Sequence, residues 1–364
     1  MTQGQTQATG DTFPCGNCGA NLHYDATSQS MRCPYCGHGQ AIVRGAAGVA
    51  REIPIEQGFA MAARGLGTPT REIACNDCGA QVQVAPNDQT ARCAFCGSHG
   101  VLARETAGNQ IRPESLVPFR VDKATAQDTF QKWLAGLWFR PSDLKKMAKV
   151  DEIGGVYVPF WTFDAYVQSR WTAQAGYHYQ ETEHYTDAQG NRQTRTVTKT
   201  RWEPASGHRS DHFDDVIVCA SRGLKPELVD RFRTWSTGEL VPYQPHYLAG
   251  WKAESYAIDL MPAWGTGQEK MAREQESRCA GDVPGDTHRS LNVHNTFSRV
   301  TFKHVLLPVW IAAYRYHDKP YPFLVNGQTG EVVGKAPWSV VKIVLFLLFL
   351  AAVIAGIVVL ARMR

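Results

Sequence analysis

The spacing of hydrophobic and polar positions changes character along the middle of the chain. In residues 121–139 the apolar side chains recur every three or four positions, which predicts a helix with one buried face; its members are Ala126, Phe130, Trp133, Leu134 and Leu137. From residue 154 to residue 179 the chain is instead rich in β-branched and aromatic residues, which predicts strands. The polar stretch 187–196 then predicts the tip of a long hairpin.

Later segments continue this alternation of strands and helices. Residues 214–221 predict a buried strand, and residues 225–235 and 262–279 predict helices, as does the short segment 140–150. Residues 300–337 predict a three-stranded meander with turns at 317–320 and 326–330. We therefore expect one mixed α+β domain over residues 112–337, rich in antiparallel strands.

The last hydrophobic run has no polar face. Residues 343–361 include neither a charge nor a proline, and at about 1.5 Å per residue they match a hydrocarbon core of about 30 Å. Lys342 precedes the run and Trp338 lies where the membrane interface is expected. The alternative is a buried core helix, which normally keeps a polar face. We expect a single-pass tail anchor in the inner membrane, with the bulk of the chain cytoplasmic.

A pair of small residues in this run, Ala352 and Gly356, has the spacing that lets two membrane helices approach closely. The pair makes a homo-oligomer a further expectation for this protein.

Near the N-terminus a cysteine pattern occurs twice. Each copy reads CxxC, fourteen residues, CxxC, and the eight cysteines are Cys15, Cys18, Cys33, Cys36, Cys75, Cys78, Cys93 and Cys96. Four such thiolates complete a closed tetrahedral zinc shell with no open position for a substrate. A glycine follows the second cysteine of every CxxC, where a tight turn needs positive φ. The pattern predicts two zinc ribbons, at 11–44 and 71–104, with a linker containing a short helix at 45–70.

Two other chemistries fit paired cysteines, namely disulfides and an iron–sulfur cluster. The N-terminal residues lack the apolar core of a signal peptide, so we expect a reducing cytoplasm, which favours metal over disulfides. A ribbon this small cannot bury enough apolar surface to fold alone. We therefore interpret both sites as structural zinc sites, with two ions per chain.

Charge limits the partners of the ribbons. The 364-residue chain has a formal net charge of +4, but residues 11–104 contain seven arginines, no lysine and seven acidic residues. Gripping a phosphate backbone needs a basic surface, because counterion release supplies most of the affinity. Arg32 and Arg92 immediately precede the second knuckle in each copy, so each ribbon offers one cation at a matching position. This balance favours a protein partner over nucleic acid.

Several segments invite a catalytic interpretation, and each has a simpler alternative. Residues 330–337 approach the phosphate-binding loop of an ATPase, but the spacing is one residue short and Ala336 replaces Ser or Thr. His208 and His212, with Asp211, Asp214 and Asp215 nearby, offer a third metal site or a hydrolase centre. We prefer to interpret this segment as a polar loop entering the strand at 216–221.

Two further cysteines and three aromatic residues complete the candidates. Cys219 has the chemistry of a nucleophile, but an apolar strand favours an inert core thiol. Cys279 has no partner motif. Trp161, Tyr166 and Trp171 are able to stack on bases or sugars, but their strand setting favours core packing.

Taken together, the motifs resemble those of a known family. The doubled ribbon, LWFRPSDL, GVYVPFWTFDA, LLPVWIAAYRY, VNGQTGEVVGKAP and the terminal apolar run together resemble the bacterial TFIIB-type zinc-ribbon membrane proteins. Members are often labelled as relatives of the primosomal replication helicase, and the resemblance implies no enzyme activity. Some members are linked with phage-shock and SPFH-type envelope-stress systems, as membrane partners that recruit peripheral proteins.

The function that we expect is accordingly a membrane-tethered scaffold, without enzyme activity, whose ribbons recruit a protein. A membrane-associated nucleic-acid-binding accessory factor is the alternative, and a metal-dependent hydrolase using the His208–Asp215 segment is a third hypothesis.

Overall fold

The computed structural model describes residues 13–42, 51–64, 71–83, 93, 95, 98, 101–105, 111–144, 149–150, 153–186, 190–233, 235–317 and 319–362. The helices are α1 (Ile55–Arg64), α2 (Lys123–Gly136), α4 (Pro226–Val229), α5 (Leu260–Asp282) and α6 (Val340–Arg362), with the 3-10 helices η1 (Thr237–Glu239) and η2 (Pro245–Leu248). The longest strands are β10 (Gly154–Thr186), β11 (Arg192–Cys219) and β14 (Thr287–Tyr316). The fold is a mixed α+β structure built on a large, mostly antiparallel sheet.

Shorter strands extend this sheet at its base. They are β4 (Ile53–Pro54), β5 (Arg71–Cys75), β6 (Gln81–Gln83), β7 (Val101–Glu105), β8 (Ser115–Leu116), β9 (Lys149–Val150), β12 (Val241–Pro242), β13 (Lys252–Glu254), β15 (Lys319–Asn326) and β16 (Val332–Gly334). A separate small sheet contains β1 (His23–Asp25), β2 (Ser30–Arg32) and β3 (Gly39–Gln40). The expected meander at 300–337 is confirmed as β14, β15 and β16.

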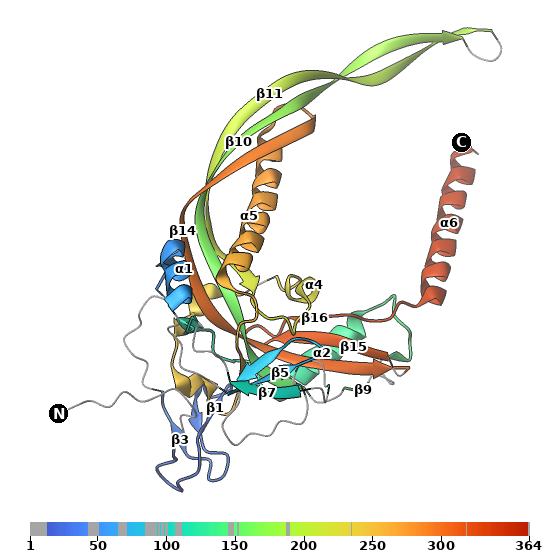
Figure 1. Ribbon diagram of the computed structural model, residues 1–364. Helices are drawn as coiled ribbons and strands as arrows, with labels where there is room; N and C mark the ends of the chain where they lie inside the picture. The colour runs from blue at the N-terminus through green and yellow to red at the C-terminus, as the bar shows by residue number, and fades with distance from the viewer. Residues whose placement is uncertain are drawn as a thin grey trace.

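Three long strands determine the shape of the molecule. β10 lies between β11 and β14 and pairs antiparallel with both, from Gly154↔Ile311 up to Gly176↔Thr287 on the β14 side. Beyond that point β10 pairs with β11 alone, up to Thr186↔Arg192. Residues 177–186 and 192–201 therefore form a two-stranded arm, and Figure 1 shows it curving over α5. Of the predicted hairpin tip, residues 192–196 belong to strand β11 at the far end of this arm, and residues 187–189 lie outside the described residues.

Burial along β10 changes where its cover changes. Residues 156–165 are all buried, because helices and loops cover both faces of the sheet there. From residue 165 to residue 173 the odd-numbered side chains are buried towards α5, and the even-numbered ones are exposed. We call the exposed side the outer face; it is the face of β10, β11 and β14 turned away from α5.

The long helix α5 covers the other face because its small and apolar residues recur at helical spacing. Its buried residues are Leu260, Ala263, Gly267, Met271, Gln275 and Cys279. Gly267 permits the close approach, since a Cβ atom there would lie 2.9 Å from the Phe163 ring. The predicted helix at 262–279 is confirmed, and it is longer at both ends. By contrast, only residues 226–229 of the helix predicted at 225–235 are helical.

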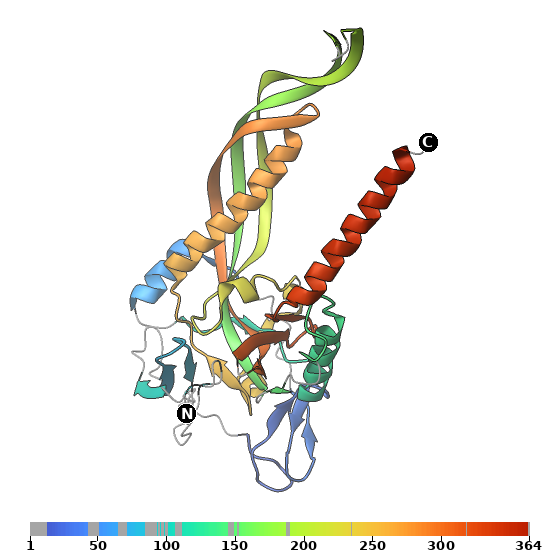
Figure 2. The ribbon, with the colours of Figure 1, turned by 90° about the vertical axis from the view of Figure 1, so that its right-hand side faces the viewer.

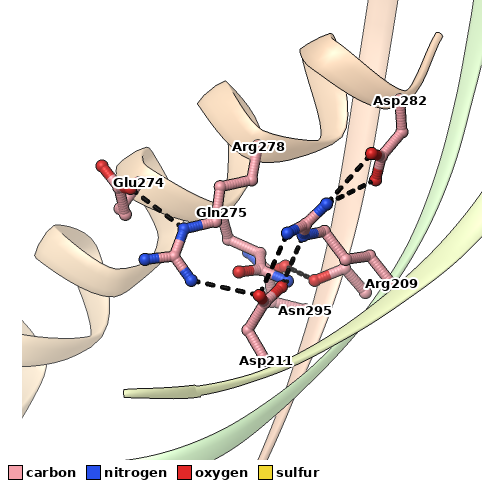
Figure 3. Close-up of polar contacts among 8 residues, drawn as sticks. Arg209, Asp211, Glu274, Gln275, Arg278, Asp282 and Asn295 are labelled. Atoms are coloured by element: carbon pink, nitrogen blue, oxygen red, sulfur yellow. Dashed lines mark hydrogen bonds and ion pairs between the residues drawn. The ribbon is translucent and has the colours of Figure 1, made fainter. Parts of the chain in front are cut away.

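Figure 3 shows a polar network that joins the C-terminal half of α5 to the sheet. Arg209 on β11 donates from Nε to Asp211 at 2.6 Å and from Nη1 to both oxygens of Asp282 at 3.0 Å. Asp211 also accepts from Gln275 Nε2 at 2.9 Å and from Arg278 Nη1 at 3.1 Å. One half-buried carboxylate thus connects β11 with two residues of α5.

The helix α2 matches the predicted helix in the region 121–139. Asp122 caps it by accepting from the Thr125 amide at 2.7 Å, and Ala126, Phe130 and Leu134 are buried. Phe130 stacks on Phe323 of β15 with ring centroids 3.8 Å apart. The helix therefore packs the C-terminal meander against the base of the sheet.

We call residues 13–42 the first cysteine module, and the described residues from 71 to 105 the second. The first module shares a hydrophobic cluster with the large domain: Leu22, Tyr24 and Met31 lie in the same cluster as Phe119 and Tyr157. Tyr24 Oη donates to Phe119 O at 3.2 Å, and Trp251 Nε1 donates to Tyr24 O at 2.9 Å. The module is therefore not a separate packing unit, although the linkers in the sequence led us to expect one.

The second module is continuous with the large sheet. Its strand β6 pairs antiparallel with β13, where Gln83 faces Ala253 and Val82 faces Glu254. β5 in turn pairs with β6 and β7. Residues 84–92, where we expected the hairpin of this module, lie outside the described residues.

The last helix, α6, stands away from the rest of the molecule in Figures 1 and 2. It begins after residues 335–339, which lead out of β16, and its apolar side chains are exposed along its length. The stretch Val340–Ala361 is long and apolar enough to cross a membrane. The predicted apolar helix is confirmed, and a buried core helix is not what the structure shows.

Candidate metal centres

Two tight turns bring the four cysteines of the first module together. Each turn is closed by a backbone hydrogen bond, from Gly19 N to Cys15 O at 2.8 Å and from Gly37 N to Cys33 O at 3.0 Å. Gly19 and Gly37 have φ values of 75° and 73°, in the left-handed region that glycine adopts without strain. The sequence prediction of positive φ after each CxxC is confirmed at these two positions.

The sulfur geometry of the first module fits one metal ion. Cys15 Sγ lies 3.6 Å from Cys36 Sγ, and Cys18 Sγ lies 3.5 Å from Cys33 Sγ. All four sulfur atoms lie within 4.8 Å of one another. A tetrahedral zinc–thiolate shell with bonds of about 2.3 Å places its sulfurs about 3.8 Å apart, whereas a disulfide needs about 2.05 Å. The spacing therefore fits a shared cation and not a disulfide.

Hydrogen bonds affect the ionisation of these sulfurs in opposite directions. The Ala20 backbone favours the Cys18 thiolate, but hydrogen bonds with Cys33 and Cys36 outweigh it and raise the pKa of Cys18 to about 12. The His38 amide, followed by the Asn17 side chain, lowers the pKa of Cys36 to about 6. The Asn17 amide also donates to Cys15 Sγ at 3.4 Å. Thiolates are the form that binds metal, and a cation offsets the repulsion between them.

The second module repeats this arrangement for the residues that the structure describes. Cys75, Cys78 and Cys93 form a group, with Cys78 Sγ and Cys93 Sγ 3.6 Å apart. Gly79 has φ 76°, and the Phe95 amide donates to Cys93 Sγ at 3.4 Å. The fourth predicted ligand, Cys96, lies outside the described residues. Two cysteine clusters that could hold metal ions are therefore present.

The two modules differ in an aromatic residue that lies at the same place in each. Tyr35 in the knuckle 33–36 is 84% exposed. Phe95, its counterpart in the knuckle 93–96, is partly buried and packs so closely on Gly223 that a Cβ atom there would lie 2.8 Å from its ring. The second knuckle thus docks onto the body of the protein, while the first presents its aromatic ring to solvent.

The third metal site considered from sequence, with His208, His212 and Asp215, is not assembled. These residues lie on the strand β11 and not in a loop, so the interpretation as a loop was wrong. His208 and His212 are exposed on the outer face, where His212 contacts Tyr166 with ring centroids 4.5 Å apart. Asp211 points to the opposite side, into the α5 network, because side chains alternate along a strand.

Asp215 belongs to a different group, which the sequence did not predict. It lies with Asp164 and Asp214 around the buried Lys303, whose Nζ is 2.7 Å from Asp215 Oδ1 and 3.5 Å from Asp164 Oδ2. Asp164 sits at a β-bulge: it has no partner in the register with β11, and its pairing with Thr301 of β14 is followed by a register shift. Burial, followed by repulsion from Asp215 and Asp164, raises the pKa of Asp214. Lys303 already supplies this group with a cation.

The other candidates have structural surroundings. Burial raises the pKa of Cys219 to about 12, and burial also raises the pKa of Cys279, which packs with Trp171. Trp161 and Trp171 are buried in the core, while Tyr166 is partly exposed on the outer face. Residues 330–337 contain the strand β16 with irregular backbone on either side, and no helix follows directly as a phosphate-binding loop requires.

The fold and these clusters define a class: an α+β protein with two N-terminal cysteine clusters and one C-terminal apolar helix. No protein-family model matches the chain, and no solved structure matches it. The chain is 30% identical over 333 residues to the Uncharacterized protein YdjG of Bacillus subtilis (strain 168), and the match covers 90% of each chain. This chain belongs to the same family as that protein.

Tyr35 was not identified from the sequence as an exposed residue, although the sequence contains a feature that points to this position. Both knuckles contain an aromatic residue before their last cysteine, in CPYC and CAFC, but the spacing is the same whether the ring is packed or free. The sequence gives no comparable signal for the group around Lys303, because Asp164, the pair Asp214 and Asp215, and Lys303 are far apart in the chain.

Proposed function

We propose that this protein is a membrane-tethered zinc-ribbon scaffold that recruits a protein partner to the cytoplasmic side of the inner membrane. The observation that carries the proposal is the first cysteine module, which presents an exposed Tyr35 on a rigid turn. In Figures 1 and 2 the module lies at the lower end of the molecule, and α6 points upward, away from it. A tethering helix and a free recognition surface are thus kept apart.

Zinc is the ion that we propose for both clusters, with a structural role. Four thiolates in a closed tetrahedral shell leave no position for a substrate, and soft sulfur ligands at this spacing suit zinc. Zinc would cross-link the two knuckles of each module. In the first module this fixes the turn on which Tyr35 stands.

A single exposed tyrosine suits protein recognition for energetic reasons. Aromatic side chains dominate the binding energy of many protein interfaces, because they bury a large area at a low cost in side-chain entropy. Arg32, which precedes the same knuckle, adds one exposed cation. This combination fits a partner with an apolar pocket and an acidic residue beside it.

The membrane tether that we propose is α6. The arm of β10 and β11 leaves the base of the molecule on the same side as α6 in Figure 1. Its charges pair with one another in water, as Lys199 does with Glu181 and Glu183 at 3.1 and 3.0 Å. A charged ribbon cannot lie in hydrocarbon. We therefore propose that the arm stays outside the hydrocarbon layer that α6 crosses.

The resemblance to TFIIB-type zinc-ribbon membrane proteins supports a place for this recruiter in an envelope-stress response. The tether and the exposed knuckle are the parts that such a role needs, and enzyme activity is not required.

Site-specific photocrosslinking tests the recruiter. A photoreactive phenylalanine analogue in place of Tyr35 should give one discrete protein adduct in native membranes. The same analogue at Tyr185, an exposed tyrosine of the arm, is the matched control. An adduct that is equally abundant from both positions, or none from position 35, contradicts the proposal.

A second function, nucleic-acid binding, is favoured by one feature of the outer face. Between residues 166–172 of β10, 206–212 of β11 and 292–299 of β14, the exposed side chains of this face include no acidic residue. Arg170 lies there in register with His208 and His294, and Arg299 lies over the Tyr166 ring at 5.2 Å. The face therefore offers cations without the neutralising acids of the ribbons.

Binding of mixed-sequence RNA and DNA to the full protein in detergent, measured against salt, decides this second function. Two arginines support only a shallow salt dependence, since the slope of log K against log salt is about 0.9 per neutralised phosphate on duplex DNA. Binding with such a shallow salt dependence that is lost in Arg170→Ala would favour the nucleic-acid function over the scaffold.

A further inference from the structure

A loop that is distant from α6 in the sequence contacts the start of this helix. Residues 137–140 follow α2, and the Ser339 amide donates to Phe139 O at 2.9 Å. The Phe139 ring meets Phe346 of α6 edge-on, with centroids 5.3 Å apart. Lys342 Nζ donates to Trp138 O at 3.1 Å. The segment LWFR, part of a motif to which the proposed function assigns no role, is thus fixed against the first turns of the helix.

Two tryptophans at this junction are exposed to solvent. Trp138 on the loop is 80% exposed, and Trp338, just before α6, is 64% exposed. Arg140 stacks on Trp338, with its guanidinium carbon 3.6 Å from the ring centroid. The same guanidinium donates to Ala336 O at 2.7 Å. These contacts therefore hold the backbone next to both tryptophans in place.

Exposed indoles in water are costly, but a membrane interface accommodates them. Trp is enriched where the hydrocarbon core meets the headgroups, because its ring is apolar and its N–H is a donor. Arginine and lysine beside the ring reach the phosphate and carbonyl groups of the same layer. This junction has both kinds of side chain at the end of the apolar helix.

We propose that Trp138 and Trp338, with Arg140 and Lys342, form an interfacial collar that binds the headgroup layer of the leaflet that α6 enters. The inference rests on α6 being the membrane tether. It adds a second membrane contact from the folded domain itself, so that the base of the sheet is fixed to the lipid surface. The collar thereby determines the angle between α6 and the arm.

Fluorescence quenching by brominated lipid tests the collar in the full-length protein. The protein is reconstituted into vesicles of phosphatidylcholine and phosphatidylglycerol, with and without lipid brominated near the headgroup end of its acyl chains. Trp138 is one of ten tryptophans. We expect Trp138→Phe to remove a measurable part of the quenched emission, and Trp338→Phe to remove another part.

Trp264, which lies on α5, provides the matched control, because it packs between Phe163 and Phe297 of the sheet. Trp264→Phe should lower the total emission and leave the quenched part unchanged. Quenching that is unchanged in Trp138→Phe overturns the collar.

Vesicle flotation separates this failure from a failure of the tether. Protein that floats with vesicles but shows no quenching of Trp138 contradicts the collar alone. Protein that does not float contradicts the tether and the collar together.

Discussion

Tyr35 and Phe95 show how one position in a repeated turn acquires two roles. Phe95 fills space against Gly223, where no larger residue fits, while Tyr35 touches solvent over most of its surface. Burial of an aromatic ring stabilises the fold, and exposure of one makes it available to a partner. The second module therefore packs on the body through Phe95, whereas the first leaves the Tyr35 ring free for the partner that we propose.

This difference predicts opposite effects of the same truncation. Phe95→Ala should lower the free energy of unfolding by about 2 kcal/mol, because it leaves a gap against the body. Tyr35→Ala should change stability by less than about 0.5 kcal/mol, as is usual for an exposed residue. Urea unfolding of the purified protein in detergent measures both. Equal losses in the two variants would mean that Tyr35 is also packed.

At the scale of elements, Asp211 is one of several links between α5 and β11, beside the Arg209–Asp282 ion pair and the hydrogen bond from Lys270 to Ile217 O. Burial opposes ionisation of Asp211, but hydrogen bonds from Arg209 and Gln275 outweigh it, so its pKa lies below the usual value. Its neighbours Arg209 and Arg278 would lose a shared partner if it were removed. This carboxylate therefore contributes to the stability of the contact between the C-terminal half of α5 and the sheet.

We predict that Asp211→Asn costs about 2 kcal/mol of stability at neutral pH, as expected for a half-buried ion pair that loses one partner. A depressed folded pKa adds stability above the unfolded value of about 3.9, and this stability is lost as the pH falls through the folded value. The difference between the variant and the wild type should therefore begin to shrink as the pH falls below about 4 and vanish only below the folded pKa of Asp211.

Thermal unfolding across this pH range measures the effect. Asp128→Asn is the control, because Asp128 pairs with Lys132 on the exposed surface of α2 and should matter little. A difference between wild type and Asp211→Asn that is constant with pH would contradict the assignment.

At the scale of the whole molecule, the first cysteine module and the large domain share one hydrophobic cluster. Cys33 belongs to this cluster together with Phe119 and Tyr157. Loss of the metal that we propose should therefore also lower the stability of the structure outside the module. This is a consequence of packing, since the ligands themselves all lie within residues 15–36.

Cys33→Ser should lower hydrogen-exchange protection around Phe119 and Tyr157 as well as in residues 13–42. Metal analysis of the wild type should give two zinc ions per chain, and the variant should retain one. Protection that is lost in residues 13–42 alone would mean that the module unfolds independently despite its contacts. Iron–sulfur absorbance in the purified protein would contradict zinc.

Removal of residues 338–364 should move the protein from the membrane to the soluble fraction. The reason is that the collar residue Trp138 alone supplies too little apolar area for stable anchoring without α6. Fractionation after a salt wash measures the distribution. Truncated protein that remains with the membranes would indicate a further anchor in the folded domain.

Features that depend on local spacing were determined by the sequence itself. The four-cysteine patterns, the buried face of α2, the helix α5 and the apolar helix α6 all follow from periods of a few residues. A turn or a helix brings such residues together wherever it occurs, so no knowledge of the rest of the fold is needed. The sequence also determined the meander at the C-terminal end of the domain.

Tertiary structure decided the features that depend on pairing across long separations. The register of β10 with β11 and β14 placed His208 and His212 on the outer face and joined Asp164 to Lys303. A shift of one residue would reverse every one of these directions, because side chains alternate along a strand. The packing of Trp138 beside α6 likewise joins segments about 200 positions apart. Periodicity within one segment contains no information about which distant segment will lie against it.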